Sequence, residues 1–273
     1  MLALPTRFLR QRVPTVDITD FTTDLFSLED KRALVTGGNG GLGRAFTLAL
    51  AAAGADVFVP SLADDDGTTE RLVSDRGRRY VFAQADITEP GVPTDMVAAC
   101  VDALGGIDIL VNSAGINLLD TVLDFGRDKW DPMIAVNLTA AFEFSHAAAS
   151  HLIPQGSGKI INIASLFSFL GGQRSPAYAA TKAGIAGLTR AYADELGPHG
   201  IQVNALAPGY VVTALTAQTR SDPNANARIV DHIPVGRWSE PADLMGALVF
   251  LASSASTYVN GHTLVVDGGY LVR

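Results

Sequence analysis

Short apolar segments that are rich in β-branched residues alternate along this chain with longer segments rich in Ala and Leu. The short segments are typical of buried strands, and the longer ones are typical of helices. Their alternation predicts an α/β fold with a doubly wound parallel sheet and helices on both faces. The predicted strands are residues 32–36, 56–59, 79–84, 107–112, 159–163, 201–206 and 264–267. The predicted helices are residues 41–53, 94–104, 129–151 and 241–252, with a further helix that begins at Pro176.

Two segments depart from this alternation. Residues 1–24 mix Arg, Pro, Thr and Asp without a period, and they predict an extended arm before a domain of residues 25–273. This arm could be disordered or could lie on a neighbouring subunit. Residues 208–239 have no strong strand pattern, and long weakly patterned segments in compact domains are often lids or binding loops. We therefore expect a short helical flap over about residues 209–239, above a substrate site.

Composition narrows the class of protein. With 273 residues, 48% hydrophobic and 18% charged, the chain suits one large α/β domain around a buried sheet. The net charge of −8 argues against nucleic acid or an anionic membrane as a main partner, so a small-molecule substrate is expected. The sequence has no long apolar run and no apolar signal core at its N-terminus, which predicts a cytoplasmic protein.

Cysteine and metal chemistry are not expected. Cys100 is the single cysteine, which rules out an internal disulfide framework. The five histidines have no metal-ligand spacing, and the run from Asp64 to Asp66 is typical of a solvated helix start. No metal site is therefore predicted.

The candidate chemistry centres on Ser165, Tyr178 and Lys182. Ser165 follows the strand predicted at residues 159–163, while Tyr178 and Lys182 are four apart on one helix and therefore share a face. A phenol titrates near pH 10. An ammonium about 4 Å away, at an effective dielectric of about 20, would favour the phenolate by about 4 kcal/mol. We expect this to bring the pKa of Tyr178 towards 7, where general acid/base catalysis is efficient, with Ser165 holding a substrate oxygen.

A glycine-rich turn joins the first predicted strand to its helix. Glycines at such a turn allow a tight bend and a close approach of the backbone to a pyrophosphate. The helix N-terminus adds free N–H groups and the positive end of its dipole. A strand before the turn and a helix after it give the context that a dinucleotide site requires. The candidate cofactor residues of this turn are Gly37, Asn39, Gly41, Leu42 and Gly43.

Further candidates follow the ends of other strands. Asp86 would place a carboxylate near an adenine, although the Asp-Ile pair could equally be a helix cap. The small residues that follow Asn112 would let the backbone approach a cofactor, and the turn at Pro208 would lie beside a ligand. Asn137 is unusual inside a long apolar helix, needs a hydrogen-bond partner if buried, and is a catalytic candidate. The remaining cofactor candidates are Ile87, Ala114, Gly115, Gly209, Val211 and Thr213.

Together these residues resemble the short-chain dehydrogenase/reductase family from about Leu25 to Arg273. The resemblance implies a seven-stranded Rossmann-type sheet, a nicotinamide cofactor and usually a homotetramer. It also implies that Tyr178 is the general acid/base and that Ser165 orients the substrate oxygen. Lys182 would bind the nicotinamide ribose and lower the Tyr178 pKa, and Asn137 would hold a water molecule in a proton relay.

Within the family, several segments look similar to gluconate 5-dehydrogenases and 2-dehydro-3-deoxy-gluconate dehydrogenases. This implies an NAD(P)-dependent oxidoreductase that interconverts a secondary alcohol and a ketone on a sugar acid or polyol. Arg174 could then contact a carboxylate or simply lie on the surface, and Tyr210 is a further substrate candidate. Those enzymes tend to carry basic residues where this chain has residues 116–119, Ile-Asn-Leu-Leu, so the substrate could be less anionic.

Two alternatives stay open for the activity. A 3-oxoacyl thioester or a cyclic ketone could be the substrate instead of a sugar acid. The chain could also be a cofactor-sensing protein without catalysis, although the presence of the Ser, Tyr and Lys favours an enzyme.

The cofactor preference depends on Ser61. This residue occupies the position at the end of the second strand where NAD enzymes place an acid on the ribose 2′-hydroxyl. Without that charge a 2′-phosphate is not repelled, which favours NADP slightly over NAD. No Arg follows at position 62 to bind the phosphate.

Overall fold

The computed structural model describes residues 18–273, so residues 1–17 of the predicted arm lie outside the described part. All seven strands form one parallel sheet in the order β3-β2-β1-β4-β5-β6-β7. This confirms the predicted doubly wound sheet. The strands are β1 (Arg32–Val35), β2 (Asp56–Ser61), β3 (Tyr80–Gln84), β4 (Ile109–Asn112), β5 (Gly158–Ile163), β6 (Ile201–Pro208) and β7 (Thr263–Val266).

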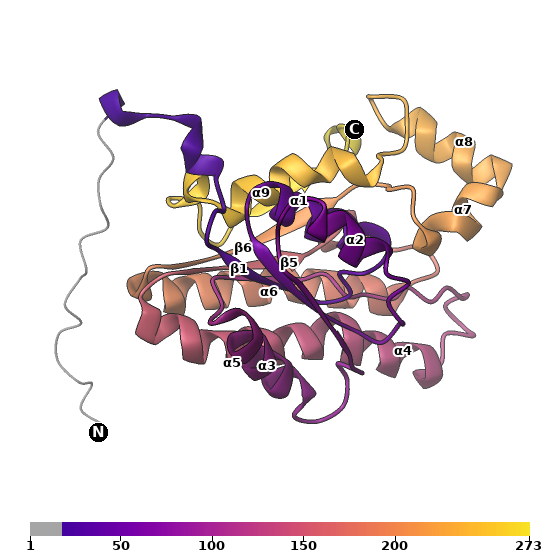
Figure 1. Ribbon diagram of the computed structural model, residues 1–273. Coiled ribbons are helices and arrows are strands. Elements are labelled where there is room, and N and C mark those ends of the chain that lie inside the picture. The colour runs from indigo at the N-terminus through magenta and orange to yellow at the C-terminus, as the bar shows by residue number, and fades with distance from the viewer. Residues whose placement is uncertain (1–17) are drawn as a thin grey trace, which may run out of the picture.

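Helices cover both faces of the sheet (Figure 1). On one face α1 and α9 pack with β1, β2 and β5 around a core that contains Phe46, Leu50 and Leu248. On the other face α3 and α5 enclose a second core that contains Phe144 and Leu152. The helices are α1 (Gly41–Ala52), α2 (Thr68–Ser74), α3 (Val92–Leu104), α4 (Arg127–Ile134), α5 (Ala140–Gln155), α6 (Pro176–Leu196), α7 (Ala217–Ser221), α8 (Pro223–His232) and α9 (Met245–Ala252).

The helix predicted at residues 129–151 differs from a plain α-helix. A π-helical segment, Ala135–Thr139, separates α4 from α5 and contains Asn137. Such π segments insert one extra residue into a turn and occur frequently at functional sites. Helix α2 follows the run from Asp64 to Asp66, which the sequence indicated as a solvated helix start, but the extent of this short helix was not predicted.

Residues 209–239, for which a short helical flap was expected, contain two short helices. A 3₁₀ turn, Ala214–Thr216, leads into α7 and α8, which stand apart from the main body at the upper right of Figure 1. Trp238 packs with Ile229 and Ile233 of α8, and its indole nitrogen donates a 2.7 Å hydrogen bond to Asn226 Oδ1. The flap is therefore fixed by a small apolar cluster of its own.

The strand order brings the candidate segments to one edge of the sheet. β2 and β3 extend the sheet on one side of β1, and β4 to β7 extend it on the other side. The point where the strand order reverses therefore lies between the neighbouring strands β1 and β4. Ligands of open α/β sheets bind beyond the carboxyl ends of the strands at such a point. The glycine-rich turn follows β1, Ser165 follows β5, and the flap follows β6.

Candidate functional site

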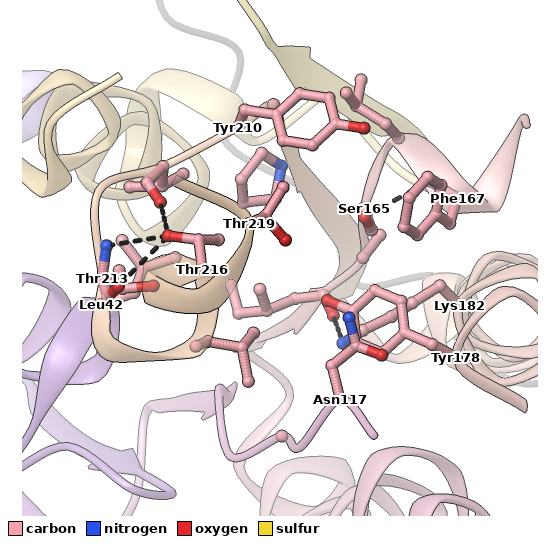
Figure 2. A pocket seen from close by; sticks show the side chains of 18 of the residues that line it. Leu42, Asn117, Ser165, Phe167, Tyr178, Lys182, Tyr210, Thr213, Thr216 and Thr219 are labelled. Carbon is pink, nitrogen blue, oxygen red and sulfur yellow. Dashed lines mark hydrogen bonds between the residues drawn. The ribbon is translucent and has the colours of Figure 1, made fainter. Parts of the chain in front are cut away.

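A cavity of about 760 Å³ opens at the carboxyl edge of the sheet. Its volume is in the range of small-molecule and cofactor sites. It is lined by the glycine-rich turn, the loop after β4, the segment from β5 into α6, and the flap (Figure 2). Among the predicted site residues, those that line it are Gly37, Gly41, Leu42, Gly43, Ala114, Gly115, Ser165, Arg174, Tyr178, Lys182, Pro208, Gly209, Tyr210, Val211 and Thr213.

The glycine-rich turn has the shape that a pyrophosphate needs. A Cβ at Gly43 would lie 2.2 Å from the carbonyl oxygen of Gly37, so only glycine permits this close packing of helix and turn. A Cβ at Gly40 or Gly41 would meet no atom within 4 Å, because both face open space beside the cavity. α1 begins at Gly41 and directs its N-terminal N–H groups to this space. The residues present therefore fit a dinucleotide.

Hydrogen bonds hold the turn against its neighbours. The hydroxyl of Thr36 accepts hydrogen bonds of 3.0 Å from the backbone N–H groups of Ser113 and Ala114, which joins the turn to the loop after β4. The buried amide of Asn39 donates to the carbonyl oxygens of Ala63 and Asp64. Asn39 thus supports the loop after β2 and does not line the cavity.

Ser165, Tyr178 and Lys182 lie together on one side of the cavity, and the flap threonines lie on the other (Figure 2). Ser165 is the N-cap of a short 3₁₀ helix, and its hydroxyl accepts from Phe167 N at 3.3 Å. The Tyr178 ring packs edge-on against Phe167, with 5.8 Å between the ring centroids. Lys182 Nζ lies 5.4 Å from the centre of the Tyr178 ring and donates a 2.6 Å hydrogen bond to the carbonyl oxygen of Ile163.

The expected lowering of the Tyr178 pKa is not what the structure gives. Burial raises the pKa of Tyr178 to about 12, and a hydrogen bond with Ser165 only partly opposes this. Burial also lowers the pKa of Lys182 to about 8. Desolvation disfavours the charged form of each group, and the Lys182 charge on which the sequence prediction relied is not among the causes that shift the Tyr178 pKa.

Asn137 has the buried partners that its position requires. Its amide donates to the carbonyl oxygen of Ile116 at 2.9 Å, and its Oδ1 accepts from Ile116 N at 2.8 Å. Only 2% of Asn137 is exposed, and it does not line the cavity. It fixes the loop that follows β4, directly behind the cavity wall at Gly115.

Four other predicted residues do not line the cavity. Asp86 accepts hydrogen bonds from the backbone and hydroxyl of Thr88, as in a turn. Ile87 is buried in the core beside α3. The amide of Asn112 donates to Asn162 and Ser145 inside the protein. Ser61 is buried at the end of β2, next to Pro60, whose carbonyl oxygen accepts a 2.8 Å hydrogen bond from Gly37 N of the glycine-rich turn.

Several lining residues were not predicted from the sequence. They belong to the loop after β4, the loop before α6, the flap and the C-terminal segment. Asn117 is an uncharged residue outside any motif, and Arg228 and His232 are four residues apart on α8, for which the sequence does not indicate which face lies towards the cavity. These residues are Asn117, Gln173, Thr216, Thr219, Arg228, Asp231, His232 and Tyr270.

Metal-ligand clusters and membrane-spanning helices are both absent from residues 18–273. Within that range no group of three or more His, Cys, Asp and Glu side chains could hold a metal ion. No helix in the same range is both long and apolar enough to cross a membrane.

Comparison with known proteins supports this geometry. Residues 37–271 match a family model described as enoyl-(acyl carrier protein) reductase. The chain is 61% identical over 253 residues to the uncharacterized oxidoreductase YgcW of Escherichia coli (strain K12), covering 93% of this chain and 97% of that protein. It is 48% identical over 250 residues to 2-dehydro-3-deoxy-D-gluconate 5-dehydrogenase of the same organism, covering 91% and 98%.

A solved structure agrees as well. The crystal structure of a gluconate 5-dehydrogenase from Burkholderia cenocepacia J2315, in complex with NADP and tartrate, matches with a TM-score of 0.88 at 37% identity. The match covers 92% of this chain and 98% of that one. Fold and cavity define a dinucleotide-binding oxidoreductase. More closely, the chain belongs to the short-chain dehydrogenase/reductase family, which confirms the resemblance drawn from the sequence.

Proposed function

We propose that this protein is an NAD(P)-dependent dehydrogenase that interconverts a secondary alcohol and a ketone on a sugar acid, as a gluconate 5-dehydrogenase does. The observation that carries the proposal is the position of Ser165, Tyr178 and Lys182 in the same cavity as the glycine-rich turn. The names of the relatives support the substrate class, since three of the best matches are dehydrogenases of gluconate derivatives.

Each catalytic side chain has a proposed role. Tyr178 gives a proton to the carbonyl oxygen or takes one from the alcohol, and Ser165 positions that oxygen with its hydroxyl. Lys182 holds the nicotinamide ribose and stabilises the phenolate by its charge. Asn137 fixes the loop at Ile116 and holds a water molecule in the proton relay. The nicotinamide, when bound, supplies or accepts the hydride.

The proposed cofactor contacts start at the glycine-rich turn. Gly37, Gly41, Leu42 and Gly43 would bind the pyrophosphate, and Ser61, Asp86 and Ile87 would lie along the adenosine half. The loops after β4 and β6 would enclose the nicotinamide half. Residues proposed for the nicotinamide half are Asn112, Ala114, Gly115, Pro208, Gly209, Val211 and Thr213.

We propose NADP as the preferred cofactor. Ser61 puts no negative charge at the end of β2, and the relative from Burkholderia cenocepacia was crystallised with NADP. Arg44, the nearest arginine on α1, is already engaged, because its guanidinium contacts Asn39, Thr69 and Asp66. The preference for NADP over NAD is therefore expected to be modest.

The test is a binding titration followed by a substrate panel. NADPH and NADH are titrated against the protein, and turnover is then measured on gluconate, 5-keto-gluconate and other aldonates. Tight NADPH binding with turnover of a sugar acid is the expected result. Turnover of only a 3-oxoacyl thioester or a cyclic ketone would keep the enzyme class and reject the substrate class. Cofactor binding without turnover of any of these would favour a sensing protein.

We also propose a cytoplasmic homotetramer in which residues 25–273 form one catalytic domain and residues 209–239 cover the substrate. The proposed location is inferred from the proposed nicotinamide cofactor. Apolar side chains at the surface support assembly, because large apolar surfaces commonly mark subunit interfaces. Phe142 on α5 is 46% exposed and Tyr258 is fully exposed. Light scattering after gel filtration tests the tetramer.

A further inference from the structure

Two arginines line the cavity from different elements of the fold. Arg174 belongs to the loop before α6, and Arg228 belongs to α8 of the flap. Both are exposed, so they lie at the mouth of the cavity. Among residues 18–273 neither forms an ion pair with a carboxylate, whereas arginines elsewhere on the surface, such as Arg127 and Arg237, do. The charge of Arg174 helps to lower the pKa of Asp120, but neither guanidinium is held in an ion pair in this range, so both can still bind an anion.

The backbone at Arg174 is held in an unusual conformation. Its φ is +65°, in the left-handed region that residues other than glycine rarely adopt. Its carbonyl oxygen accepts a 2.9 Å hydrogen bond from Asp120 N, and the hydroxyl of Ser175 donates to Asn117 Oδ1 and to the carbonyl oxygen of Leu118. Strained backbone of this kind persists only where its surroundings hold it, and it clusters at binding sites. The loop after β4 thus fixes where Arg174 enters the cavity wall.

Arg228 is positioned by the apolar cluster of the flap. The next residue, Ile229, is buried against Trp238, so the backbone of α8 is fixed at this point. Tyr210, which also lines the cavity, lies close enough to Arg228 for the guanidinium charge to act on the Tyr210 pKa. Burial and Tyr270 raise the Tyr210 pKa, and the Arg228 charge opposes them. The guanidinium of Arg228 therefore lies on the cavity side of the flap.

We propose that Arg174 and Arg228 together bind the carboxylate of the substrate, one from the loop before α6 and one from the flap. This inference rests on the proposed sugar-acid function and assigns its specificity to two residues. Guanidinium groups bind carboxylates through paired charge-assisted hydrogen bonds. Besides these two arginines, the cavity lining contains one carboxylate, that of Asp231, with His232 next to it in the sequence.

The assignment also explains how an anionic substrate could bind although residues 116–119 lack the basic residues that similar enzymes tend to carry there. This loop carries no basic residue, which by itself suggests a less anionic substrate. Positive charge reaches the same cavity from the loop before α6 and from the flap instead. Because Arg228 lies on the flap, binding of the carboxylate would also draw the flap towards the body of the protein.

The experiment compares Arg174→Gln and Arg228→Gln with wild type on the sugar acid that the panel identifies. Each variant should raise KM roughly ten- to a hundredfold, the effect of losing a charge-assisted hydrogen bond. The kcat and the NADPH affinity should stay close to wild type, and Arg→Lys should recover part of the loss. Arg190→Gln on α6, an exposed arginine that does not line the cavity, is the matched control. An unchanged KM, or a parallel loss of kcat and NADPH affinity, overturns the proposal.

A second measurement separates this proposal from the proposed function. Tartrate, a hydroxylated dicarboxylate, is titrated into the complexes of wild type and both variants with NADP. Binding that the Arg→Gln changes abolish supports the carboxylate site even if no sugar acid is turned over, in which case only the proposed function fails. Tartrate binding that is equal in all three proteins, or absent from wild type, overturns the carboxylate site and leaves the function to the substrate panel.

Discussion

The Nζ of Lys182 lies 5.4 Å from the centre of the Tyr178 ring while it donates a hydrogen bond to Ile163, the last residue of β5. The ammonium is thus tied to the sheet edge, one helical turn from the phenol. Burial raises the Tyr178 pKa and lowers the Lys182 pKa. The acidity of Tyr178 consequently depends on how far a bound cofactor and substrate change the surroundings of both groups.

Tyr178→Phe removes the proton donor and keeps the ring that packs against Phe167. We expect turnover to fall by roughly a hundred- to ten-thousandfold, the usual contribution of a general acid or base. NADPH affinity should change little. Steady-state kinetics together with a fluorescence titration of NADPH measure both quantities. Activity close to wild type would show that another group transfers the proton.

Ser61→Asp tests the cofactor preference. A carboxylate at the end of β2 repels a 2′-phosphate and accepts a hydrogen bond from a 2′-hydroxyl. We expect the ratio of kcat/KM for NADPH over NADH to fall tenfold or more. Ser61→Asn is the matched control, because it has nearly the same shape as Asp and no charge. A ratio that does not move in Ser61→Asp would mean that Ser61 lies away from the ribose.

Substitutions at two glycines of the glycine-rich turn separate the effect of this turn on stability from its effect on NADPH binding. Gly43→Ala forces a Cβ to 2.2 Å from the Gly37 carbonyl oxygen, so we expect both a lower melting temperature and weak NADPH binding. At Gly40 the backbone φ is −146°, which alanine adopts, and a Cβ meets no protein atom. Gly40→Ala should therefore keep the melting temperature and still weaken NADPH binding. Wild-type affinity in Gly40→Ala would place the pyrophosphate elsewhere.

The strands and the order of the site motifs could be predicted from the sequence because each rests on local chemistry. A β-branched run buries itself in a parallel sheet, and glycines before a helix form a phosphate turn. These signals located the glycine-rich turn, Ser165, Tyr178 and Lys182 without any tertiary information. The structure brings all of them to one cavity.

What could not be predicted depends on tertiary burial and on contacts between distant segments. The Tyr178 pKa was wrong in direction because the sequence gives the spacing to Lys182 but not the loss of solvent around both groups. The buried partners of the Asn137 side chain could not be predicted because they belong to Ile116, in the loop after β4. Arg228 was missed because the cavity lies on one side of α8, and the sequence of the flap does not say which side.

Asn137→Asp tests the role of that loop contact. The carboxylate can still accept from Ile116 N, but it no longer donates to the Ile116 carbonyl oxygen. An unpartnered buried group costs about 1–3 kcal/mol and a charged one costs more, so the free energy of unfolding in urea should fall by at least that amount. The kcat should fall as well, because the loop at Gly115 lines the cavity. Loss of stability with an unchanged kcat would limit Asn137 to a structural role.

The substitution Lys159→Met tests how a buried ammonium affects the stability of the fold. Lys159 lies on β5, away from the cavity; its Nζ donates a 3.2 Å hydrogen bond to Ser256, and burial lowers its pKa to about 8. An unfolded lysine has a pKa of about 10.4. Below pH 8 both states are charged and the folded state bears the full cost of burying the ammonium, about 3 kcal/mol at most. Between pH 8 and about 10.4 the folded state loses its proton first, so this cost disappears.

We therefore expect Lys159→Met to raise the free energy of unfolding by about 1–3 kcal/mol at pH 7, and by much less near pH 10.5. Ser256 keeps its hydrogen bonds to the carbonyl oxygens of Leu251 and Ser253, so its hydroxyl is not left unpartnered. Urea denaturation at the two pH values gives the comparison, with Lys31→Met as the exposed control. A gain of the same size at both pH values would mean that the added apolar packing of Met, and not the buried charge, sets the stability at this position.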